Sequence, residues 1–447
     1  MQAKNSGGSS RSGDLCETGI SAVSLGQARQ LASLFDLPEP IEAFEFPEKG
    51  NINRVTFLIV AGRPGDCDEY LLQRLNPDVF CQPQAVMEAM ASCIHAQQKA
   101  LSEGILREEE WEPVRLIPTK EGKDYLEVLK EAGAECWRMM RKIGHAQSYK
   151  NLREIPDAEV RLQVAEQAGR GLALFGILTA SMGVSALGCP LPGYRDTRLY
   201  YDQLASVLAG SRTLQDAAAW LPSDPLLRRS TQQHFLLHIN PDGYRSRAED
   251  PQMQRLIALA LDQKPFACTL LDGLDAGNLR RVAVHGDTKL DNFLFSTRTG
   301  RIKALVDLDT IMPHTWLTDW GDLARSLVNI AGESERDPGK IEVDAEIFRA
   351  LAAGFLGSAR DLTTSEMNLM VEAAQIMALE LGVRFLADYL RGDTYFRLSP
   401  AEARDLNKTR ALVQFSVFGK IRARADSLKR LIEEFERRGA PQRQSLR

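Results

Sequence analysis

The chain has 447 residues, of which 44% are hydrophobic and 26% charged, and this composition excludes a disordered, collagen-like or membrane-embedded protein. Lys and Arg number 55 against 60 Asp and Glu, giving a net charge of -5, so nucleic acid is not an expected partner. A chain of this length exceeds one compact core and predicts two lobes.

Cysteine usage and the absence of targeting signals predict a cytoplasmic location. The seven cysteines are scattered, without a CxxC pair, which favours reduced thiols over a disulfide framework or a zinc site. The first residues lack the apolar run of a secretory signal, and no segment reaches the roughly 18 apolar residues of a membrane span. We therefore expect no membrane partner, and the sequence does not indicate an oligomeric state.

Residues 1–40 are expected to form a disordered tail and lead-in, and residues 41–145 a small antiparallel sheet with one main helix. Short β-type runs separated by Gly and Pro predict strands within 43–46, 53–60, 69–75, 111–119, 124–129 and 134–143. Apolar residues at helical spacing predict a helix over 83–101. This region is interpreted as the nucleotide-binding lobe.

Residues 146–447 are expected to form a larger, mainly helical lobe that carries the acceptor site. Helical periodicity is found within 158–181, 198–210, 251–263, 366–390 and 409–436, and the end of the chain is a basic amphipathic helix. The exception is a hairpin of two β-type runs, 293–296 and 302–309, joined by a turn at 297–300. The predicted fold class is therefore α+β, with two lobes.

The stretch HGDTKLDN, which begins at His285, concentrates polar residues between apolar runs. Asp287 is followed by four residues and then Asn292, and Asp307 comes fifteen residues later. Phosphoryl transfer needs a carboxylate that receives the acceptor's proton and oxygen ligands for magnesium, and this order and spacing match the protein-kinase pattern. We therefore predict Asp287 as the base and Asn292 and Asp307 as magnesium ligands. If the strand continues past Asp307, Asp309 shares its face and could act as a further metal group.

Two other interpretations of these residues stay open. Asp287 and Asn292 could simply cap turns while His285 fills a core position, although buried polar groups without partners are costly. The motif LVDLDTI also matches the paired-aspartate nucleophile of metal-dependent phosphatases. That pattern calls for Thr or Val where Ile311 stands, and it leaves Asp287 and Asn292 without a role.

The HGDxxxxN motif followed by a hydrophobic-Asp-x-Asp strand resembles the aminoglycoside phosphotransferase and choline kinase family, small-molecule kinases with a protein-kinase-like fold. Supporting segments extend from about Phe44 to Phe415 and include GNINRVTFLIV, YLLQRLNPDVFCQP, ECWRMM, LPGYRDTRLYYDQL and VDLDTIMPHTWLTDWGDLAR. Within this family the chain is similar to bacterial N-acetylhexosamine 1-kinases. The resemblance implies ATP and Mg²⁺ as cofactors and the roles given above for Asp287, Asn292 and Asp307.

The resemblance also implies a nucleotide site in the first lobe. The turn at Gly50, with Asn51 and Asn53, would lie over the ATP phosphates, and the adenine would stack near Met140. The third strand should offer a basic residue to the phosphates. Gln73 stands where Lys or Arg is common and Arg74 follows on the other face, so either could point inward.

Two further groups follow from the same resemblance. Glu88, on the helix after the third strand, would pair with the basic residue of that strand, unless it is a solvated helix residue. Arg384 lies in an apolar helical run that should end at Gly392, and with Tyr395 it would line the sugar site. The alternative is an ion pair of Arg384 with Asp388 and a core tyrosine at Tyr395.

The most consistent function is transfer of the ATP γ-phosphoryl group to a sugar hydroxyl, which we expect to be the anomeric one of an N-acetylhexosamine or related sugar. Asn51 and Ser326 depart from the sugar kinases, which have a histidine and an aromatic residue there. The alternatives are a kinase of the same family that acts on an aminoglycoside or amino-alcohol, and a catalytically silent nucleotide-binding scaffold. The cation at Arg384 favours a neutral or anionic acceptor over these amines.

Overall fold

The computed structural model describes residues 23–47, 52–53, 55–106, 109–131, 133–399 and 401–443. Its strands are β1 (Ile41–Glu45), β2 (Thr56–Arg63), β3 (Asp66–Arg74), β4 (Leu116–Ile117), β5 (Leu126–Lys130), β6 (Gly133–Arg141), β7 (Ala146–Gln147), β8 (Val282–Val284), β9 (Phe293–Ser296), β10 (Ile302–Leu305) and β11 (Met312–His314). The longer α-helices are α1 (Leu25–Ala32), α2 (Pro83–Ser102), α3 (Ala158–Thr179), α4 (Thr197–Leu208), α6 (Pro241–Ala248), α7 (Pro251–Asp262), α10 (Trp316–Val328), α11 (Ala345–Ser358), α13 (Met370–Arg391), α14 (Leu406–Ala423) and α15 (Ala425–Arg443). Shorter helices are α5 (Pro225–Thr231), α8 (Lys264–Ala267), α9 (Thr269–Asp275), α12 (Thr364–Asn368), η4 (Leu290–Asn292) and η5 (Leu308–Thr310).

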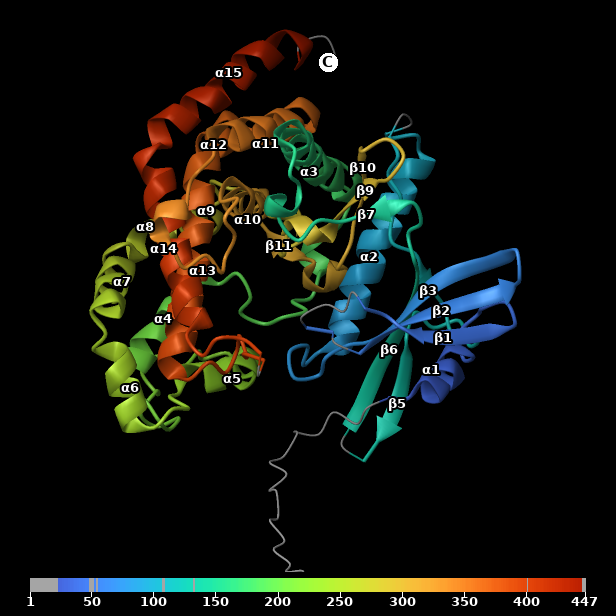
Figure 1. Cartoon of the computed structure of the whole chain (residues 1–447), viewed down its shortest axis with the longest axis horizontal. Helices are drawn as coiled ribbons and strands as arrows, with labels where there is room; N and C mark the ends of the chain where they lie inside the picture. The colour runs from blue at the N-terminus through green and yellow to red at the C-terminus, as the bar shows by residue number, and fades with distance from the viewer. Residues whose placement is uncertain are drawn as a thin grey trace, which may run out of the picture.

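The first lobe is an antiparallel sheet with the strand order β1-β2-β3-β6-β4, and β5 pairs with β6 beside this path (Figure 1). β2 and β3 are joined by the predicted turn, in which Gly65 has a φ of +89°. α2 lies beside the sheet, between it and the helices of the second lobe (Figure 1). The predicted α+β class with a small antiparallel sheet and a larger helical part is therefore confirmed.

Two elements of the first lobe differ from the prediction. The strand expected within 111–119 is reduced to Leu116–Ile117, because Pro113 and Pro118 cannot donate to a β-ladder. Within the expected lead-in the chain forms α1, which begins with a capping box between Ser24 and Gln27 and packs beside β1. Residues 1–22 of the expected tail lie outside the described residues.

α2 joins the core of the second lobe rather than that of the sheet. Its apolar face, with Val86, Met90, Cys93 and Ile94, is buried in the same cluster as the α3 residue Phe175. The opposite side of the sheet has its own core, built with α1. Because α2 lies where the sheet meets the helices, it fixes the position of β3 relative to the second lobe.

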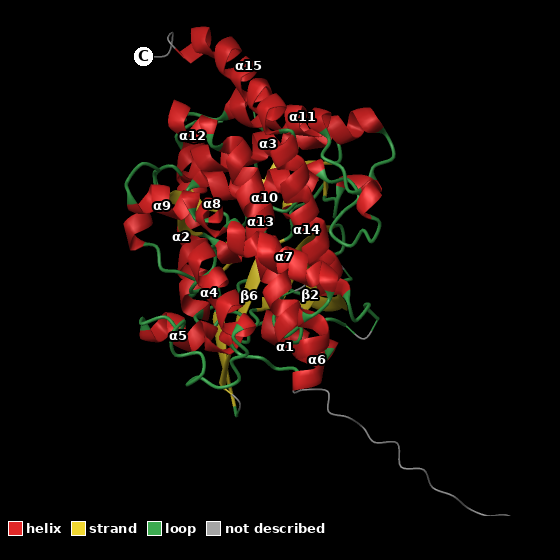
Figure 2. Cartoon of the chain, turned by 90° about the vertical axis from the view of Figure 1, so that its left-hand side faces the viewer, coloured by secondary structure: helices red, strands yellow, loops and turns green. Residues whose placement is uncertain are grey.

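The second lobe is built almost entirely of helices (Figure 2). α3 and α11 approach so closely that a Cβ on Gly354 would lie 1.8 Å from the carbonyl oxygen of Glu166. Only glycine fits at this crossing, which explains why both helices carry glycine. α15 packs along α11 and buries Leu428 and Ile432, so the C-terminal helix is docked on its own lobe. None of the described helices is both long and apolar enough to span a bilayer.

Short strands inside this lobe carry the polar residues found in the sequence. β9 pairs with β10 and β7, and β8 pairs with β11. The hairpin of β9 and β10 confirms the predicted one, but its second strand ends at Leu305 rather than at residue 309. Asp307 adopts the left-handed conformation with a φ of +64°, and η5 follows. The strand therefore does not continue past Asp307, and the condition under which Asp309 would share its face is not met.

Candidate functional site

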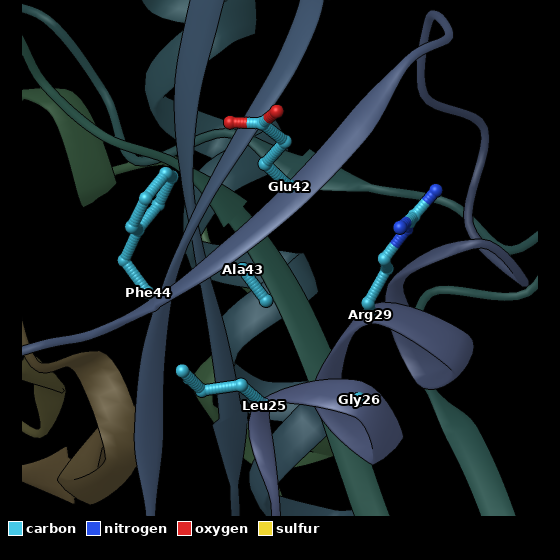
Figure 3. A pocket seen from close by; sticks show the side chains of 6 residues that line it. All are labelled: Leu25, Gly26, Arg29, Glu42, Ala43 and Phe44. Carbon is cyan, nitrogen blue, oxygen red and sulfur yellow. The ribbon is translucent and has the colours of Figure 1, made fainter.

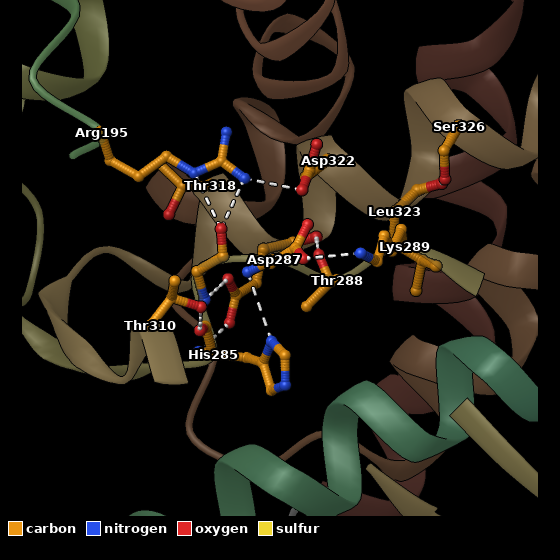
Figure 4. A network of polar contacts seen from close by, with 12 residues as sticks. Arg195, His285, Asp287, Thr288, Lys289, Thr310, Thr318, Asp322, Leu323 and Ser326 are labelled. Atoms are coloured by element: carbon orange, nitrogen blue, oxygen red, sulfur yellow. Dashed lines mark hydrogen bonds and ion pairs between the residues drawn. The ribbon is translucent and has the colours of Figure 1, made fainter. Parts of the chain in front are cut away.

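The segment 285–292, between β8 and β9, is called the Asp287 loop below. Asp319 of α10 holds its start: the backbone N–H groups of His285 and Gly286 donate to the two Asp319 oxygens over 2.6 and 2.8 Å. The Thr310 hydroxyl donates to the His285 carbonyl over 2.7 Å (Figure 4). These bonds satisfy a buried backbone that has no ladder partner, so the loop has one defined shape.

Gly286 is required by the geometry of this loop. Its φ is +84°, and a Cβ at this position would lie 2.6 Å from the carbonyl oxygen of Thr310. An L-residue would therefore suffer both the left-handed backbone and a clash with main-chain atoms that cannot rotate away. The glycine of the HGD motif is thus explained by packing against the segment that follows Asp307.

The Gly286 carbonyl accepts hydrogen bonds from two residues of the segment before α4. The Tyr194 hydroxyl donates over 3.0 Å. The Arg195 guanidinium donates from Nε and Nη2 over 3.0 and 2.7 Å (Figure 4). Arg195 also forms buried ion pairs with Asp322 at 2.6 Å and Glu380 at 3.2 Å. Burial alone would raise the pKa of Asp322, but the adjacent arginines outweigh it and hold this pKa well below its usual range.

Asp287, Asn292 and Asp307 lie in one neighbourhood. Nδ2 of Asn292 donates to the Asp287 carbonyl over 2.7 Å and lies 3.4 Å from Asp287 Oδ2. The backbone N–H of Val306, next to Asp307, donates to the Asn292 carbonyl over 2.9 Å. The left-handed Asp307 then turns the chain at the end of β10. The structure thus brings the three predicted residues together from the loop and the hairpin.

The donor set fits a magnesium ion. Asn292 donates its Nδ2 to the Asp287 carbonyl, so its Oδ1 is the atom available to a metal ion. Among the described residues, no hydrogen-bond donor contacts the Asp307 carboxylate, which is therefore also available. The Asp307 side chain is in contact with solvent, but the surrounding protein limits its hydration. This limited hydration, together with the negative charges of Asp309 and Asp287, raises the pKa of Asp307 to about 6. A divalent cation would offset this concentration of carboxylates.

No three His, Cys, Asp or Glu side chains of the described residues group as a metal site. An ion at Asp307 would therefore be completed by the Asn292 amide and by oxygens from outside the protein. Magnesium accepts such a set, since it is commonly held by one or two carboxylates, water and phosphates.

Lys289 places a positive charge beside Asp287. Its Nζ lies 3.1 Å from Asp287 Oδ2 (Figure 4). It also lies 4.0 Å from Asp291 Oδ2. Burial alone would lower the pKa of Lys289, but the carboxylates of Asp287, Asp291 and Asp307 outweigh it and raise this pKa. Lys289 is therefore protonated next to the predicted base.

β3 directs Gln73 and Arg74 to opposite faces of the sheet. Gln73 lies directly opposite Arg138 of β6, and its Oε1 accepts from Arg138 Nε over 3.1 Å. Arg74 forms an ion pair with Glu135, also on β6. Since Arg138 in turn pairs with Asp309, Gln73 is the residue of β3 that faces the second lobe.

Glu88 does not pair with β3 in this structure. α2 turns Glu88 to solvent, where its carboxylate accepts from Gln84 over 3.0 Å. Met140 lies on β6 opposite Leu71 and packs against the main core. Of Gln73, Arg74, Glu88 and Met140, only Gln73 therefore hydrogen-bonds with Arg138, the residue that pairs with Asp309.

The turn expected over the phosphates is described only in part. Gly50 and Asn51 lie outside the described residues. Asn53 is buried, and its Nδ2 donates to Asp309 Oδ2 over 2.6 Å while its Oδ1 accepts from the Asn76 backbone over 2.9 Å. Asn53 therefore contacts the segment after Asp307 directly.

Arg384 and Tyr395 lie together in an aromatic cluster. The Arg384 guanidinium carbon is 4.8 to 5.4 Å from four ring centroids, and its Nη2 donates to the Tyr395 hydroxyl over 3.2 Å. The four rings belong to Tyr194, Tyr200, Tyr395 and Phe396.

The alternative ion pair of Arg384 with Asp388 does not form. Asp388 pairs with Arg391 at 2.8 Å and accepts backbone N–H groups after the Gly392 cap. Tyr194 connects the aromatic cluster to the Asp287 loop, because it stacks with Arg384 and donates to the Gly286 carbonyl. Arg384 is therefore two contacts away from Gly286, the residue that precedes the predicted base.

A surface depression of about 330 Å³ lies between α1 and β1 (Figure 3). It is lined by Leu25, Gly26, Arg29, Glu42, Ala43 and Phe44. None of these residues contacts the Asp287 loop, and we assign the depression no part in the reaction. Ser326, noted above as a departure from the sugar kinases, donates its hydroxyl to the Leu323 carbonyl of its own helix over 2.8 Å.

Sequence reasoning missed several residues that shape this site. Arg195, Asp319 and Arg138 act through partners that are distant in the chain, so no local spacing connects them. Arg138 did carry a signal, because it is a single arginine in the apolar run CWRMM. Lys289 also carried one, since it lies two residues after Asp287 in the motif itself.

Residues 43–352 match the sequence profile of the phosphotransferase enzyme family, which covers more than half of the chain. A microcompartment-associated aminopropanol kinase has a similar structure, with a TM-score of 0.51 at 14% identity, over 91% of this chain and 99% of that one. An amicoumacin kinase, solved with AMP-PNP, Ca²⁺ and Ami, is similar with a TM-score of 0.50 at 12% identity, over 87% and 93%. At these identities the two structures show the fold alone. The chain belongs to the phosphotransferase enzyme family.

Proposed function

We propose that this protein is an ATP- and Mg²⁺-dependent kinase that phosphorylates a sugar hydroxyl, the anomeric one of an N-acetylhexosamine or a related sugar. The observation that carries the proposal is the convergence of Asp287, Asn292 and Asp307 beside the aromatic cluster of Arg384. The solved amicoumacin kinase, whose complex contains AMP-PNP and a divalent cation, supports a nucleotide and metal as partners of this fold.

Asp287 is the base in this proposal. It orients the acceptor hydroxyl and accepts its proton as the hydroxyl oxygen attacks the γ-phosphorus, while the bond from this phosphorus to the β–γ bridging oxygen breaks and ADP leaves. Lys289, 3.1 Å from Asp287, keeps the carboxylate oriented and adds positive charge on the side of the transferred group. When bound, Mg²⁺ offsets the negative charge of the phosphates, and Asn292 Oδ1 and the Asp307 carboxylate hold it.

The hydrogen bonds around Gly286 make this geometry rigid before the substrates bind. Asp319 holds the loop from the amide side, and Tyr194 and Arg195 hold it from the carbonyl side. A base fixed in this way needs little reorganisation during the reaction. Positioning of the reacting groups and preorganised charges are the main ways in which a protein lowers the barrier to phosphoryl transfer.

The charges near the expected acceptor site support a neutral or anionic acceptor. Arg384 presents a cation, and the nearby carboxylates of Asp322 and Glu380 are each 2% exposed and engaged by Arg195. An amine acceptor would therefore meet repulsion without a compensating carboxylate. Hydrogen bonds from Arg384 and stacking on Tyr395 suit a sugar ring with a carbonyl-bearing substituent.

The test is an ATP-consumption screen with N-acetylglucosamine, N-acetylgalactosamine, their parent hexoses, an aminoglycoside and aminopropanol. We expect N-acetylhexosamine-dependent ATP consumption and a phosphorus NMR signal of an anomeric phosphate. Consumption with an amine acceptor alone would instead support the amine-kinase alternative, of which the solved aminopropanol kinase is an example.

The silent-scaffold alternative makes a different prediction in the same screen. MgATP would raise the melting temperature, but no acceptor would accelerate ATP consumption, and Asp287→Asn would change nothing. Asp275→Asn is the matched control, because Asp275 is an exposed carboxylate that pairs with Arg198 away from the loop.

A further inference from the structure

The first lobe lacks a basic residue at the place where protein kinases carry one. In that fold a lysine on the third strand contacts the phosphates and pairs with a glutamate on the following helix. Here β3 presents Gln73 toward the second lobe, Arg74 faces the other side with Glu135, and Glu88 of α2 is exposed. Neither partner of that ion pair is in position.

A cation reaches the same place from the neighbouring strand. Arg138 of β6 is the register partner of Gln73, so both side chains project from the same face of the sheet. The Arg138 guanidinium donates to Gln73 Oε1 from Nε over 3.1 Å, and its Nη1 contacts Sδ of Met90 on α2 over 3.3 Å. Arg138 thus lies between β3 and α2, where the kinase ion pair would lie.

The counterion comes from the second lobe instead of α2. Nη1 of Arg138 forms an ion pair with Asp309, and the two side chains are 2% and 3% exposed. Asp309 is two residues after Asp307, and its other oxygen accepts from Asn53 of the turn before β2. A positive charge is therefore held two residues from the predicted metal ligand and beside the side chain that Asn53 contacts. Consistent with this proximity, Arg138 lowers the pKa of Asp307, against the larger effects that raise it.

Stability does not explain this arrangement. Burying an ion pair usually gains nothing over a hydrophobic pair of the same volume, because the desolvation cost offsets the attraction. Moreover, two donors of the guanidinium fork, Nε and Nη2, point at a neutral acceptor, the carboxamide of Gln73. An arginine fork binds phosphate oxygens more strongly than a carboxamide, because such hydrogen bonds are charge-assisted on both sides.

We propose that Arg138 contacts the phosphates of the bound nucleotide in place of a basic residue on β3, with Asp309 as the carboxylate that orients it. The phosphate oxygens take the place of Gln73 Oε1 on the arginine fork, while the ion pair with Asp309 stays. This inference rests on the proposed function and assigns Asp309 to Arg138 rather than to a metal ion.

The test measures binding of MgATP and of adenosine to the full chain by calorimetry, so that it does not depend on turnover. For Arg138→Gln we expect MgATP affinity to fall about 10- to 100-fold, the usual effect of losing a hydrogen bond to a charged group, and adenosine affinity to stay unchanged. Arg74→Gln is the matched control, because Arg74 pairs with Glu135 across the same two strands but on the opposite face.

The double variant Gln73→Lys/Arg138→Gln separates a phosphate contact from a structural role. It moves the cation to β3, and we expect it to recover most of the MgATP affinity. If Arg138→Gln does not fold, Arg138→Lys keeps the charge without the fork, and we expect it to weaken MgATP binding but not adenosine binding.

Three results would overturn the inference: unchanged MgATP affinity in Arg138→Gln, an equal loss for MgATP and adenosine, or failure of the double variant to recover affinity while it remains folded. If Arg138→Gln does not fold, unchanged MgATP binding by Arg138→Lys has the same meaning. A wild-type chain that does not bind MgATP at all would instead refute the proposed function, so the two failures are distinguishable.

Discussion

Asp319 Oδ2 lies 2.6 Å from the backbone nitrogen of His285, although the two residues are separated by 33 others along the chain. Its second oxygen accepts the N–H of Gly286. One carboxylate of α10 therefore fixes the two residues that precede Asp287. The position of the predicted base depends on this long-range contact as much as on the local motif.

Replacing Asp319 by Ala should destabilise the fold strongly. It leaves two buried N–H groups without an acceptor, and we expect a loss of about 2 to 4 kcal/mol of unfolding free energy, measured by urea denaturation. Asp344→Ala is the control, because Asp344 also accepts two backbone N–H groups but caps α11 at the surface. There water can replace the carboxylate, and a loss of about 1 kcal/mol is expected. Equal losses in both variants would contradict this account of the loop.

Gly286→Ala should lower both stability and kcat. The new Cβ would lie 2.6 Å from the Thr310 carbonyl oxygen, so the loop must shift and carry Asp287 with it. Gly277→Ala provides the comparison, since Gly277 has a similar φ of +71° but no atom within 4 Å of the added Cβ. That variant should lose only about 1 to 2 kcal/mol for the left-handed backbone and keep its kcat. A Gly286→Ala enzyme with unchanged kcat would show that the loop tolerates the shift.

Arg384→Met should raise KM for the acceptor about tenfold or more and leave KM for ATP unchanged, because hydrogen bonds from a charged group are lost on the acceptor side only. Steady-state kinetics with each substrate varied in turn measures the two constants. Arg247→Met is the matched control: Arg247 also stacks on a tyrosine ring, 4.4 Å from the Tyr389 centroid, but is neutralised by Asp393. A rise in KM for ATP in Arg384→Met would move Arg384 from the acceptor to the nucleotide.

His314 should make the protein less stable as the pH falls. Burial, together with the charges of Arg195 and Arg281, lowers its pKa from 6.5 to about 4. Below pH 6.5 the unfolded chain binds a proton that the folded chain refuses, so unfolding free energy decreases with falling pH until about pH 4. The total loss from this group is about 3 kcal/mol. Urea unfolding of His314→Gln between pH 7 and 4 should show a shallower slope, and parallel slopes would exclude His314 as the cause.

The sequence allowed the prediction of features that depend on local spacing. The face of α2 could be predicted because Val86, Met90 and Cys93 follow the helical period, and the end of α13 because Gly392 suits a left-handed cap. The neighbourhood of Asp287, Asn292 and Asp307 could be expected for the same reason, since a loop and a hairpin bring them together.

Features that depend on distant contacts could not be predicted. The left-handed turn at Asp307 ends β10 early, and Thr310 in the segment after it packs against Gly286, a residue distant in the chain. α1 has only eight residues, too few for a clear periodic signal. The strand pattern shows that Gln73 and Arg74 face opposite sides of the sheet, but it does not show which side meets the second lobe. That was decided only by the pairing of β3 with β6, which places Gln73 opposite Arg138.

The central claim is that Asp287, Asn292 and Asp307 form the site at which a nucleotide delivers its outer phosphoryl group. A crystal structure of the wild-type chain with AMP-PNP and Mg²⁺ tests it most directly. The account predicts a metal ion bound to Asn292 Oδ1 and the Asp307 carboxylate, with the γ-phosphate on the side of Asp287. A nucleotide bound elsewhere, or a metal ion that contacts neither Asn292 nor Asp307, would contradict it.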